Sequence, residues 1–460
     1  MNSLIGTKSF YKKTILIALP IIVQNAITAF VAMLDNIMVG RLGTDPMSGV
    51  AITNQLMFVF NIFVFGGISG AGIFCAQYFG KGDNKGVHYT FRFKIYIALA
   101  ICIMAFFVFL KFGDSLISLY LHEGGNAGNL EATKNFGLSY LKIMLIGLIP
   151  FAISQVYAST LRECGKIKLP MVAGIIAVCV NTVLNYILIF GKFGAPKLGS
   201  DGAAIATVIS RVVEMVIIVI ITHAKKKENS FAVGFYDSMR IPVPVAKQIL
   251  IKGIPLLVNE MLWAMGMAII NQCYAYRGLS VVAAININST IANIFNIVYL
   301  AMGNVVAIIV GQLLGAGKKE EAIRTDRQLL AFSVMVTSVV GIIMIFFSGL
   351  FPRIYNTENE VRELAKGFII ISSLILPAQA YCHSGYFTVR SGGKTKLVFL
   401  FDSGYMYFLV IPVAFLLSRF ANISPVMLFM IVQSNEIFKC FIIYLVLKRG
   451  TWAQNIVENI

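Results

Sequence analysis

The chain has 460 residues, of which 58% are hydrophobic and only 13% are charged, and its mean hydropathy is +0.81. No soluble globular protein needs this much apolar surface, so the composition excludes that class and indicates a bilayer as the solvent. A formal net charge of +17 would suggest a nucleic-acid partner in a soluble protein. Here the Lys and Arg residues lie in short loops between apolar segments. We therefore expect contacts with the lipid bilayer and its anionic headgroups, and no nucleic acid.

Twelve apolar segments are long enough to cross a membrane, since a helix needs about 20 residues to span about 30 Å of hydrocarbon. Runs of this length also differ from the alternating segments of about ten residues that build a β-barrel. The sequence therefore predicts an all-α polytopic membrane protein, whose first segment is too long to be a cleavable signal. The predicted spans are 14–39, 46–78, 93–119, 136–159, 169–190, 202–223, 250–275, 279–313, 328–351, 364–388, 397–418 and 424–447.

The basic residues predict the orientation of these spans. With the N-terminus inside, the inner loops and adjoining helix ends carry 25 Lys and Arg residues, against 10 on the outer side. Because basic loops stay in the cytoplasm, this bias predicts a multi-pass protein of the plasma (inner) membrane with both termini in the cytoplasm.

The two halves of the sequence repeat each other. The segment TLRECGKIKL at 160–169 returns as TVRSGGKTKL at 388–397, with a shift of 228. Pro20-Ile-Ile-Val likewise returns as Pro255-Leu-Leu-Val, with a shift of 235. Since each half holds six spans, the repeats are parallel, as in several transporter folds. We predict an N-terminal six-helix lobe (1–224), a cytoplasmic linker (225–248) and a C-terminal six-helix lobe (249–460).

Five acidic residues fall in or near the spans, where a carboxylate costs about 2.5–3.5 kcal/mol and needs a reason. Glu214 follows Arg211 by three residues, and Glu436 precedes Lys439 by three, so each has a partner on its own helix face. Asp402 lies about 9 Å into its span. From there it could reach Lys394 or Lys396, or it could serve a function.

Asp35 and Glu260 lack a basic residue within four positions. Asp35 is about 9 Å below the outer end of its helix, and Glu260 is about 12 Å from Lys252, near the midplane. A carboxyl group in such a place can exchange a proton, or it can hold a hard cation such as Na⁺ among neutral oxygen donors. A functional role is therefore favoured for both residues.

Other polar residues in the spans leave more than one reading open. Asn181 and Asn185 are four apart and share a helix face, while Asn286, Asn288, Asn293 and Asn296 are read as interhelical hydrogen-bonding groups. His383 fits a proton relay and a packed core histidine equally well. The seven cysteines have no metal-ligand spacing and are read as small buried hydrophobes.

Several motifs in this order resemble the multidrug and toxic compound extrusion (MATE) family over residues 12–447. They are MLDNIMVGRLG, AQYFGKGD, VNTVLNYILIFG, GAAIAT, GQLLGAGKKEEA and loops of the LRECGKIKLP kind. The resemblance implies two six-helix bundles facing each other in a V. It also implies export of amphipathic, often cationic, organic compounds, driven by inward Na⁺ or H⁺.

The resemblance also implies roles for particular residues. Asp35 matches the aspartate of the first helix that takes the coupling ion, with Na⁺ as its metal if the protein is sodium-coupled. Asn181, Asn185 and Thr207, the last residue of GAAIAT, complete the predicted coupling-ion site. Asn185 stands where one branch of the family has a second aspartate, and the LNY sequence is similar to the NorM-like branch.

The predicted second-lobe site, for charge or substrate, consists of Glu260, Gln379 and His383. Glu260 resembles the seventh-helix glutamate of the NorM-like branch. Gln379 lies near the place where that branch has a tenth-helix aspartate after a proline, so an expected acid is missing here.

These observations predict a secondary antiporter and not an enzyme, with no cofactor besides the coupling ion. The alternatives are a flippase for lipid-linked oligosaccharides, a membrane prenyl transferase and a passive channel. The acidic site disfavours the first, because phosphate needs a cationic cavity. The second needs paired aspartates for Mg²⁺-diphosphate, which the inner loops lack. The lobe repeat and lone carboxylates disfavour the third. A monomer is what the resemblance implies.

Overall fold

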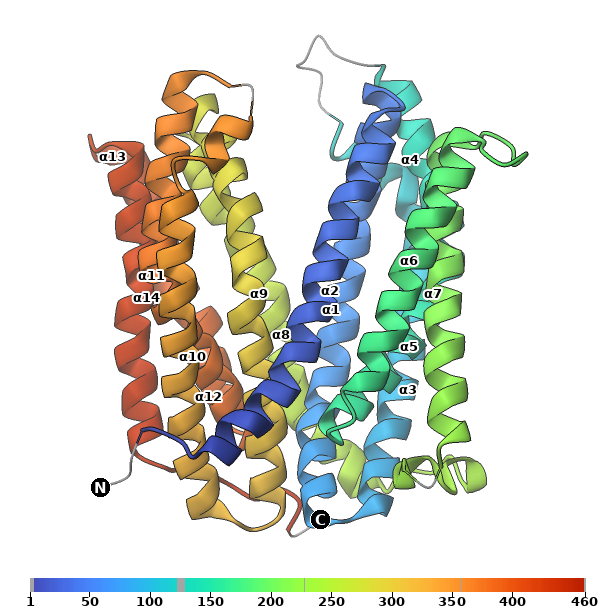
Figure 1. Cartoon of the computed structure of the whole chain (residues 1–460), viewed down its shortest axis with the longest axis vertical. Helices are drawn as coiled ribbons and strands as arrows, with labels where there is room; N and C mark the ends of the chain where they lie inside the picture. The colour runs from blue at the N-terminus through green and yellow to red at the C-terminus, as the bar shows by residue number, and fades with distance from the viewer. Residues whose placement is uncertain (1–3, 122–128, 227, 356, 459–460) are drawn as a thin grey trace. The chain divides into compact units, whose positions relative to one another are not determined.

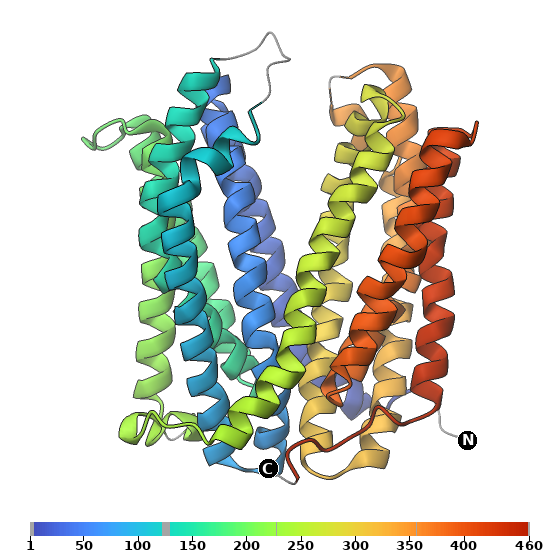
Figure 2. The ribbon, with the colours of Figure 1, turned by 180° about the vertical axis from the view of Figure 1, so that it is seen from behind.

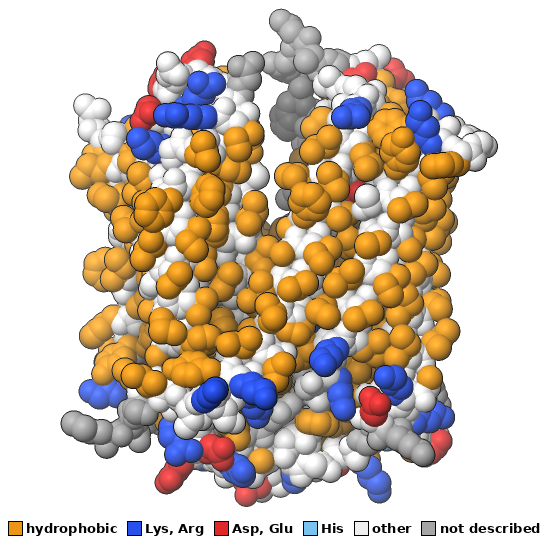
Figure 3. Space-filling model, in the orientation of Figure 1, with side chains coloured by type: hydrophobic (Ala, Val, Ile, Leu, Met, Phe, Trp, Pro, Cys, Tyr) orange, Lys and Arg blue, Asp and Glu red, His pale blue; other side chains and the backbone are white. Residues whose placement is uncertain are grey.

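The computed structural model describes residues 4–121, 129–226, 228–355 and 357–458 (Figures 1 and 2). This part of the chain holds twelve helical spans long and apolar enough to cross a membrane, as predicted. Lys227, one of the basic residues behind the predicted orientation, lies outside the described residues. Charged side chains gather at the helix ends, while the face drawn in Figure 3 is apolar along the helices.

Six spans precede the linker. They are α1 (Lys8–Gly40), α2 (Thr44–Lys81), α3 (Asn84–Ser118), the continuous run of α4 (Leu130–Met144), η1 (Leu145–Gly147) and α5 (Leu148–Glu163), then α6 (Lys168–Phe190) and α7 (Gly199–Ala224). The linker carries two short 3₁₀ turns, η2 (Ser230–Ala232) and η3 (Phe235–Asp237).

Six further spans follow the linker. They are α8 (Val243–Ala275), α9 (Leu279–Gly315), α10 (Lys319–Phe347), α11 (Asn359–Ser391), the run formed by α12 (Thr395–Phe399), η5 (Leu400–Gly404), η6 (Met406–Val410) and α13 (Ile411–Phe420), and α14 (Pro425–Lys448). A 3₁₀ turn, η4 (Phe351–Ile354), follows α10.

The positions of the helix ends follow the sequence repeat. Both ends of α8 lie where a shift of 235 from the ends of α1 would place them, and the last residue of α11 follows that of α5 by a shift of 228. These are the two shifts found in the sequence. Pro20 and Pro255 therefore occupy the same place in α1 and in α8.

Contacts divide the chain into two compact units. The N-terminal unit holds Val23–Cys75 and Asn84–Lys247, and the C-terminal unit holds Gln248–Ile460 with two early segments, Met1–Ile22 and Ala76–Asp83. Both early segments have close partners in the C-terminal unit. The ring of Tyr11 lies 5.2 Å from that of Phe332 on α10. The predicted lobe boundaries at 224 and 249 stay a prediction.

The end of α2 lies directly against α9. A Cβ atom on Gly80 would stand 2.0 Å from the carbonyl oxygen of Gln312, and one on Gly315 would stand 1.9 Å from the carbonyl oxygen of Gln77. Only glycine permits two backbones to approach this closely. The pair therefore fixes the end of α2 in the C-terminal unit.

The Gln77 side chain ties three stretches of the C-terminal unit together. Its Nε2 donates to the carbonyl oxygens of Ser391 (2.8 Å) and Gln454 (3.0 Å), and its Oε1 accepts from the amide of Ile456 (2.8 Å). Trp452, close to this contact in sequence, is 1% exposed. The segment after α14 is thus packed against the ends of α2 and α11.

Packing within each unit follows the apolar faces of the helices. In the N-terminal unit α6 lies along α7, and in the C-terminal unit α9 packs against α10 and α11 (Figures 1 and 2). Ser372 of α11 donates to Asn288 Oδ1 of α9 at 3.1 Å, an interhelical hydrogen bond of the kind predicted for that asparagine group.

The eleventh span departs from α-helical geometry. Its residues 400–404 and 406–410 form two π-helical segments, η5 and η6, between α12 and α13. A π-helix is rare and is frequently found at functional sites. Asp402 and Ser403 lie in the first of these segments.

Candidate functional site

A polar cluster surrounds Asp35 inside the N-terminal unit. Asn185 Nδ2 of α6 donates to Asp35 Oδ1 of α1 at 2.6 Å, and also approaches Asn181 Oδ1 at 3.2 Å. Asn181 Nδ2 donates to Thr207 Oγ1 of α7 at 3.3 Å. The four residues predicted as one site are therefore joined in a continuous chain of hydrogen bonds.

The sequence positions these side chains through helix periodicity. Asn181 and Asn185 are one helical turn apart, and their mutual hydrogen bond shows that they share a face of α6. Both asparagines are buried, at 7% and 1% exposure, whereas Asp35 is half-buried. The cluster thus presents one carboxylate at the edge of a buried amide pair.

Asp35 makes no ion pair within the described residues. The nearby Arg211 pairs with Glu214 instead, at 3.2 Å, as predicted from their spacing. The cationic head of Arg211 also stands 5.1 Å from the ring centre of Phe151. The charge of Asp35 is thereby left available for an exchangeable ion.

The donor atoms around Asp35 suit a hard cation. Asn185 Oδ1 is buried and has no hydrogen-bond partner in the described part of the chain. Asn181 Oδ1 and Thr207 Oγ1 add neutral oxygens further along the same chain of hydrogen bonds. A carboxylate among neutral oxygens is the donor set that hard cations prefer. This arrangement can hold Na⁺, or Asp35 can take up a proton in its place.

One residue of this cluster was not found from the sequence. Tyr140 of α4 is 4% exposed and lies next to Thr207. Tyr140 is far from the other members of the cluster along the chain, and no motif singles it out. Only the packing of α4 against α7 brings it to the cluster.

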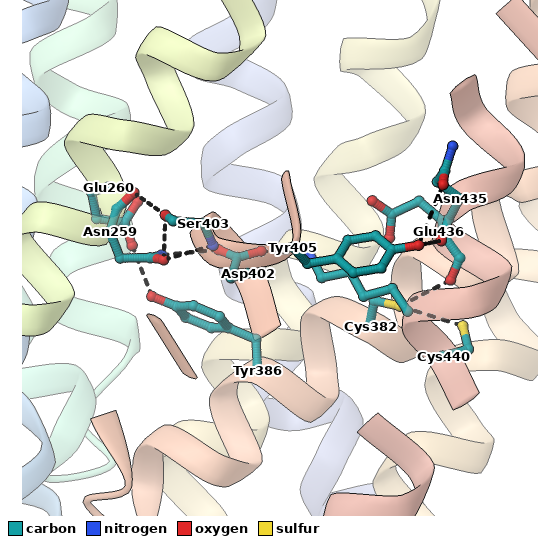
Figure 4. Close-up of polar contacts among 11 residues, drawn as sticks. Asn259, Glu260, Cys382, Tyr386, Asp402, Ser403, Tyr405, Asn435, Glu436 and Cys440 are labelled. Carbon is teal, nitrogen blue, oxygen red and sulfur yellow. Dashed lines mark hydrogen bonds and ion pairs between the residues drawn. The ribbon is translucent and has the colours of Figure 1, made fainter. Parts of the chain in front are cut away.

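A second polar cluster lies inside the C-terminal unit, around Glu260 of α8. The hydroxyl of Tyr386 on α11 donates to Glu260 Oε1 at 3.0 Å. Figure 4 shows this contact next to Asn259, Ser403 and Asp402. Glu260 has no ion-pair partner among the residues that the structure describes, as its sequence position predicted.

Asp402 is held by partners from two other helices. Asn259 Nδ2 of α8 donates to Asp402 Oδ2 at 2.9 Å, and Lys439 Nζ of α14 forms an ion pair with Asp402 Oδ1. Ser403 Oγ donates to Asn259 Oδ1 at 2.7 Å, which fixes the amide. Every oxygen of Asp402 is therefore engaged.

This ion pair corrects two predictions. Asp402 does not reach Lys394 or Lys396, and Lys439 pairs with Asp402 instead of Glu436. The physical reason is that α14 packs against η5, so the amine meets a carboxylate across the helix interface. The side chains of Lys439 and Asp402 are only 14% and 13% exposed, so the ion pair is nearly buried.

The remaining predicted residues of the second lobe differ in their placement. His383 lies in an aromatic setting, with its ring 5.2 Å from Tyr299, 5.0 Å from Phe387 and nearly parallel to Tyr386. Gln379 Nε2 instead approaches Gln433 Oε1 at 3.5 Å. His383 therefore joins Glu260 through Tyr386, whereas no hydrogen bond in the described ranges links Gln379 to that glutamate.

The hydrogen bond to Glu260 predicts an asymmetric result for two Tyr→Phe variants. Tyr386→Phe should lower the free energy of unfolding by about 1.5–3 kcal/mol, because it removes a bond to an ionisable group and leaves a carboxyl less satisfied. Tyr407→Phe removes a bond to the Leu262 carbonyl and should cost only about 0.5–1.5 kcal/mol. Thermal unfolding in detergent measures both. Equal shifts would mean that Tyr386 does not support Glu260.

Twelve apolar helices in two repeats, each unit with a cluster of buried polar side chains, define a two-lobed membrane transporter. The MatE family model matches the chain twice, at residues 20–187 and 255–416. The chain belongs to this family, the MATE multidrug efflux transporters. The first match begins at Pro20 and the second at Pro255, the two prolines that the sequence repeat pairs.

Relatives and solved structures agree with this assignment. The chain is 24% identical over 448 residues to a probable multidrug resistance protein NorM of Thermotoga maritima, covering 97% of this chain and 94% of that protein. It is 23% identical to the probable multidrug resistance protein YoeA of Bacillus subtilis, covering 90% and 89%.

Two solved structures share the fold. One is a MOP superfamily transporter from Pyrococcus furiosus, with a TM-score of 0.87, 16% identity and coverage of 98% of this chain and 97% of that one. The other is the Vibrio cholerae MATE transporter VcmN in its bent form, with a TM-score of 0.84, 18% identity and coverage of 96% and 97%.

Proposed function

We propose that the protein exports amphipathic, often cationic, organic compounds in exchange for Na⁺ or H⁺ that moves inward. The observation that carries this proposal is the Asp35 cluster, a half-buried carboxylate among amide and hydroxyl groups to which no basic side chain of the described residues is bonded. The multidrug resistance names of the relatives favour drug export over the transport of lipid-linked oligosaccharides.

Exchange follows if the ion and the drug favour different states of Asp35. The ionised carboxylate attracts a cationic substrate, and Na⁺ or H⁺ arriving from outside neutralises it and lowers its affinity for that substrate. Such coupling needs only a differential affinity of the two ligands for the two states. Phe30 and Met33, exposed on the same helix, supply apolar contacts that tolerate varied ligands.

Pro20 gives α1 a place to bend. Proline removes one hydrogen bond from the interior of a helix, so α1 is weakened between its basic start and the segment that holds Asp35. We infer that neutralisation of Asp35 is accompanied by bending at this point. A bent form is recorded for VcmN of V. cholerae.

The orientation of the chain makes the exchange favourable. With both termini in the cytoplasm, as the basic loops predict, the ion enters down the membrane potential. One charge moving inward gains about 2.3 kcal/mol per 100 mV, which drives export of a neutral substrate. When one singly charged cation leaves for each ion that enters, the two charges cancel, and the concentration gradient of Na⁺ or H⁺ drives the exchange. The transporter works as a monomer and needs no cofactor in this proposal.

Reconstituted vesicles test the proposal and identify the ion. Vesicles of protein and lipid are loaded with ethidium, and efflux is followed after a Na⁺ gradient is imposed at fixed pH, then after a pH gradient at fixed Na⁺. Acceleration by the first gradient alone assigns Na⁺, and acceleration by the second assigns H⁺. An efflux rate that neither gradient changes would indicate a passive pathway and overturn the proposal.

A further inference from the structure

A small cavity lies in the C-terminal unit where α8 meets the turn between α11 and α12. Its volume is about 350 Å³, and it is lined by Ile251, Lys252 and residues 393–397. It is separate from both polar clusters, since none of the residues assigned to them lines it. The repeat TVRSGGKTKL provides most of its wall.

Three lysines lie around the cavity, and no counter-charge from the described residues pairs with them. Lys252, Lys394 and Lys396 all line it, and none of them forms an ion pair with a described carboxylate. Lys252 Cε lies only 3.8 Å from the place of a Cβ on Gly393, so the amine-bearing chain reaches the turn itself. Three like charges around one hollow repel each other unless an anion lies between them.

A buried hydroxyl points to the same kind of ligand. Thr395 is 1% exposed and lines the cavity, yet its Oγ1 has no hydrogen-bond partner in the described part of the protein. A buried polar group without a partner is costly, so a missing acceptor is indicated. A phosphate oxygen can accept from a hydroxyl and from ammonium groups at once.

The sequence repeat supplies an internal comparison. The first-half counterparts of Lys394 and Lys396 are also lysines, Lys166 and Lys168, so the basic turn is common to both halves. The counterparts of Lys252 and Thr395 are Ile17 and Ile167, both apolar and buried. The third lysine and the hydroxyl are therefore features of the second half alone.

The surroundings of the cavity favour a lipid over a soluble anion. Ile251 lines it and is 43% exposed, and the neighbouring Leu400 is 61% exposed. The lysines thus lie at a helix end bordered by exposed apolar side chains. Such a place suits a lipid, whose headgroup can meet the lysines while its acyl chains meet the apolar side chains. Basic pockets between helices on the cytoplasmic side of a membrane bind lipid headgroups.

We propose that this cavity binds the phosphate group of an anionic membrane lipid, with Lys252, Lys394 and Lys396 pairing with the phosphate and Thr395 donating a hydrogen bond to it. The site differs from the coupling-ion cluster in charge, location and ligand, and it does not depend on the transport proposal. Its probe is phosphatidylglycerol, a singly charged glycerophospholipid.

Native mass spectrometry of the full chain tests the site. The purified protein is titrated with phosphatidylglycerol, and the affinity of its tightest-bound copy is measured for three variants. Each lysine removed near a lipid surface should weaken binding by about fivefold, so Lys252→Gln/Lys396→Gln should lose about 25-fold. Thr395→Val keeps every charge and should also weaken binding. The matched control Lys166→Gln/Lys168→Gln, in the first-half turn, should leave this copy in place.

Other outcomes would overturn the proposal. An equal loss in the control variant would mean that the lysines attract lipid only as a diffuse basic surface. Retention of the tightest copy by Lys252→Gln/Lys396→Gln would place that copy elsewhere. Displacement of the lipid by millimolar inorganic phosphate or glycerol 3-phosphate would assign the cavity to a soluble phosphate. Neutral phosphatidylcholine should not fill the site, and binding of it with equal affinity would contradict the role of charge.

Discussion

Asp35→Asn should abolish gradient-driven efflux while leaving the protein folded. The amide keeps the shape of the side chain and can still meet Asn185, but it can neither hold a proton nor supply the negative charge that Na⁺ needs. Because coupling of ion and drug typically changes affinity by about 5- to 150-fold, its loss should lower the initial rate of ethidium efflux from loaded vesicles by at least about fivefold.

The matched control is Asp114→Asn, the same chemical change at a more exposed position. The side chain of Asp114 is 61% exposed and pairs with Lys134 at 2.8 Å, and such surface pairs contribute little to stability. This variant should transport at the parental rate. An Asp35→Asn protein that matched the parent in efflux under both gradients would remove Asp35 from the mechanism.

Lys439→Met should strongly destabilise the C-terminal unit. It deletes one member of a nearly buried ion pair and strands the carboxylate of Asp402, which typically costs about 3–5 kcal/mol. Asn259 still donates to that carboxylate but carries no charge. The midpoint of thermal unfolding in detergent measures the loss, and the yield of monodisperse protein gives a second reading.

A double variant separates the stranded charge from other effects of the substitution. Asp402→Asn/Lys439→Met removes both charges and should recover most of the lost stability, because replacing a whole buried pair is often neutral. Lys366→Met is the matched control, since its pair with Glu363 is largely exposed, and it should change stability by less than about 1 kcal/mol. A double variant no more stable than Lys439→Met would contradict the ion-pair account.

The sequence predicted the spans and the Asp35 cluster because both depend on local patterns. Apolar runs of sufficient length predict the helices, and the four-residue spacing of Asn181 and Asn185 predicts that they lie on one face of a helix. The absence of a nearby basic residue also distinguished Asp35 and Glu260 correctly from Glu214, which pairs with Arg211 on its own helix.

Contacts between helices were harder to predict. Their spacing of three residues predicted an ion pair between Glu436 and Lys439. The π-helical segment at 400–404 instead brings Asp402 to the Lys439 amine from another span. Tyr386 and Tyr140 reach their clusters through the packing of α11 and α4, and nothing in their local sequence indicates it. Such partners are determined by tertiary packing, which local patterns in a single sequence do not predict.

The two acids are not copies of one ancestral position, since the repeat aligns Glu260 with Asn25 and Asp35 with Ile270. Their surroundings in the structure are likewise different. Among the described residues, the side chain bonded to Asp35 is the neutral Asn185, whereas Glu260 lies near an ion pair and a ring stack. Two half-transporters of similar fold have therefore acquired distinct chemistry.

The contacts of Gln77 have a consequence for how the protein is made. Its partners Gln454 and Ile456 lie 377 and 379 residues further along the chain. The end of α2 leaves the ribosome among the first helices, yet its hydrogen bonds cannot form until nearly the whole chain has been synthesised. Gly80 can pack only after α9 has been synthesised, and Gln77 can complete its hydrogen bonds only after the segment beyond α14 has been synthesised. Assembly of the C-terminal unit is thus completed by joining some of the earliest residues made to some of the last.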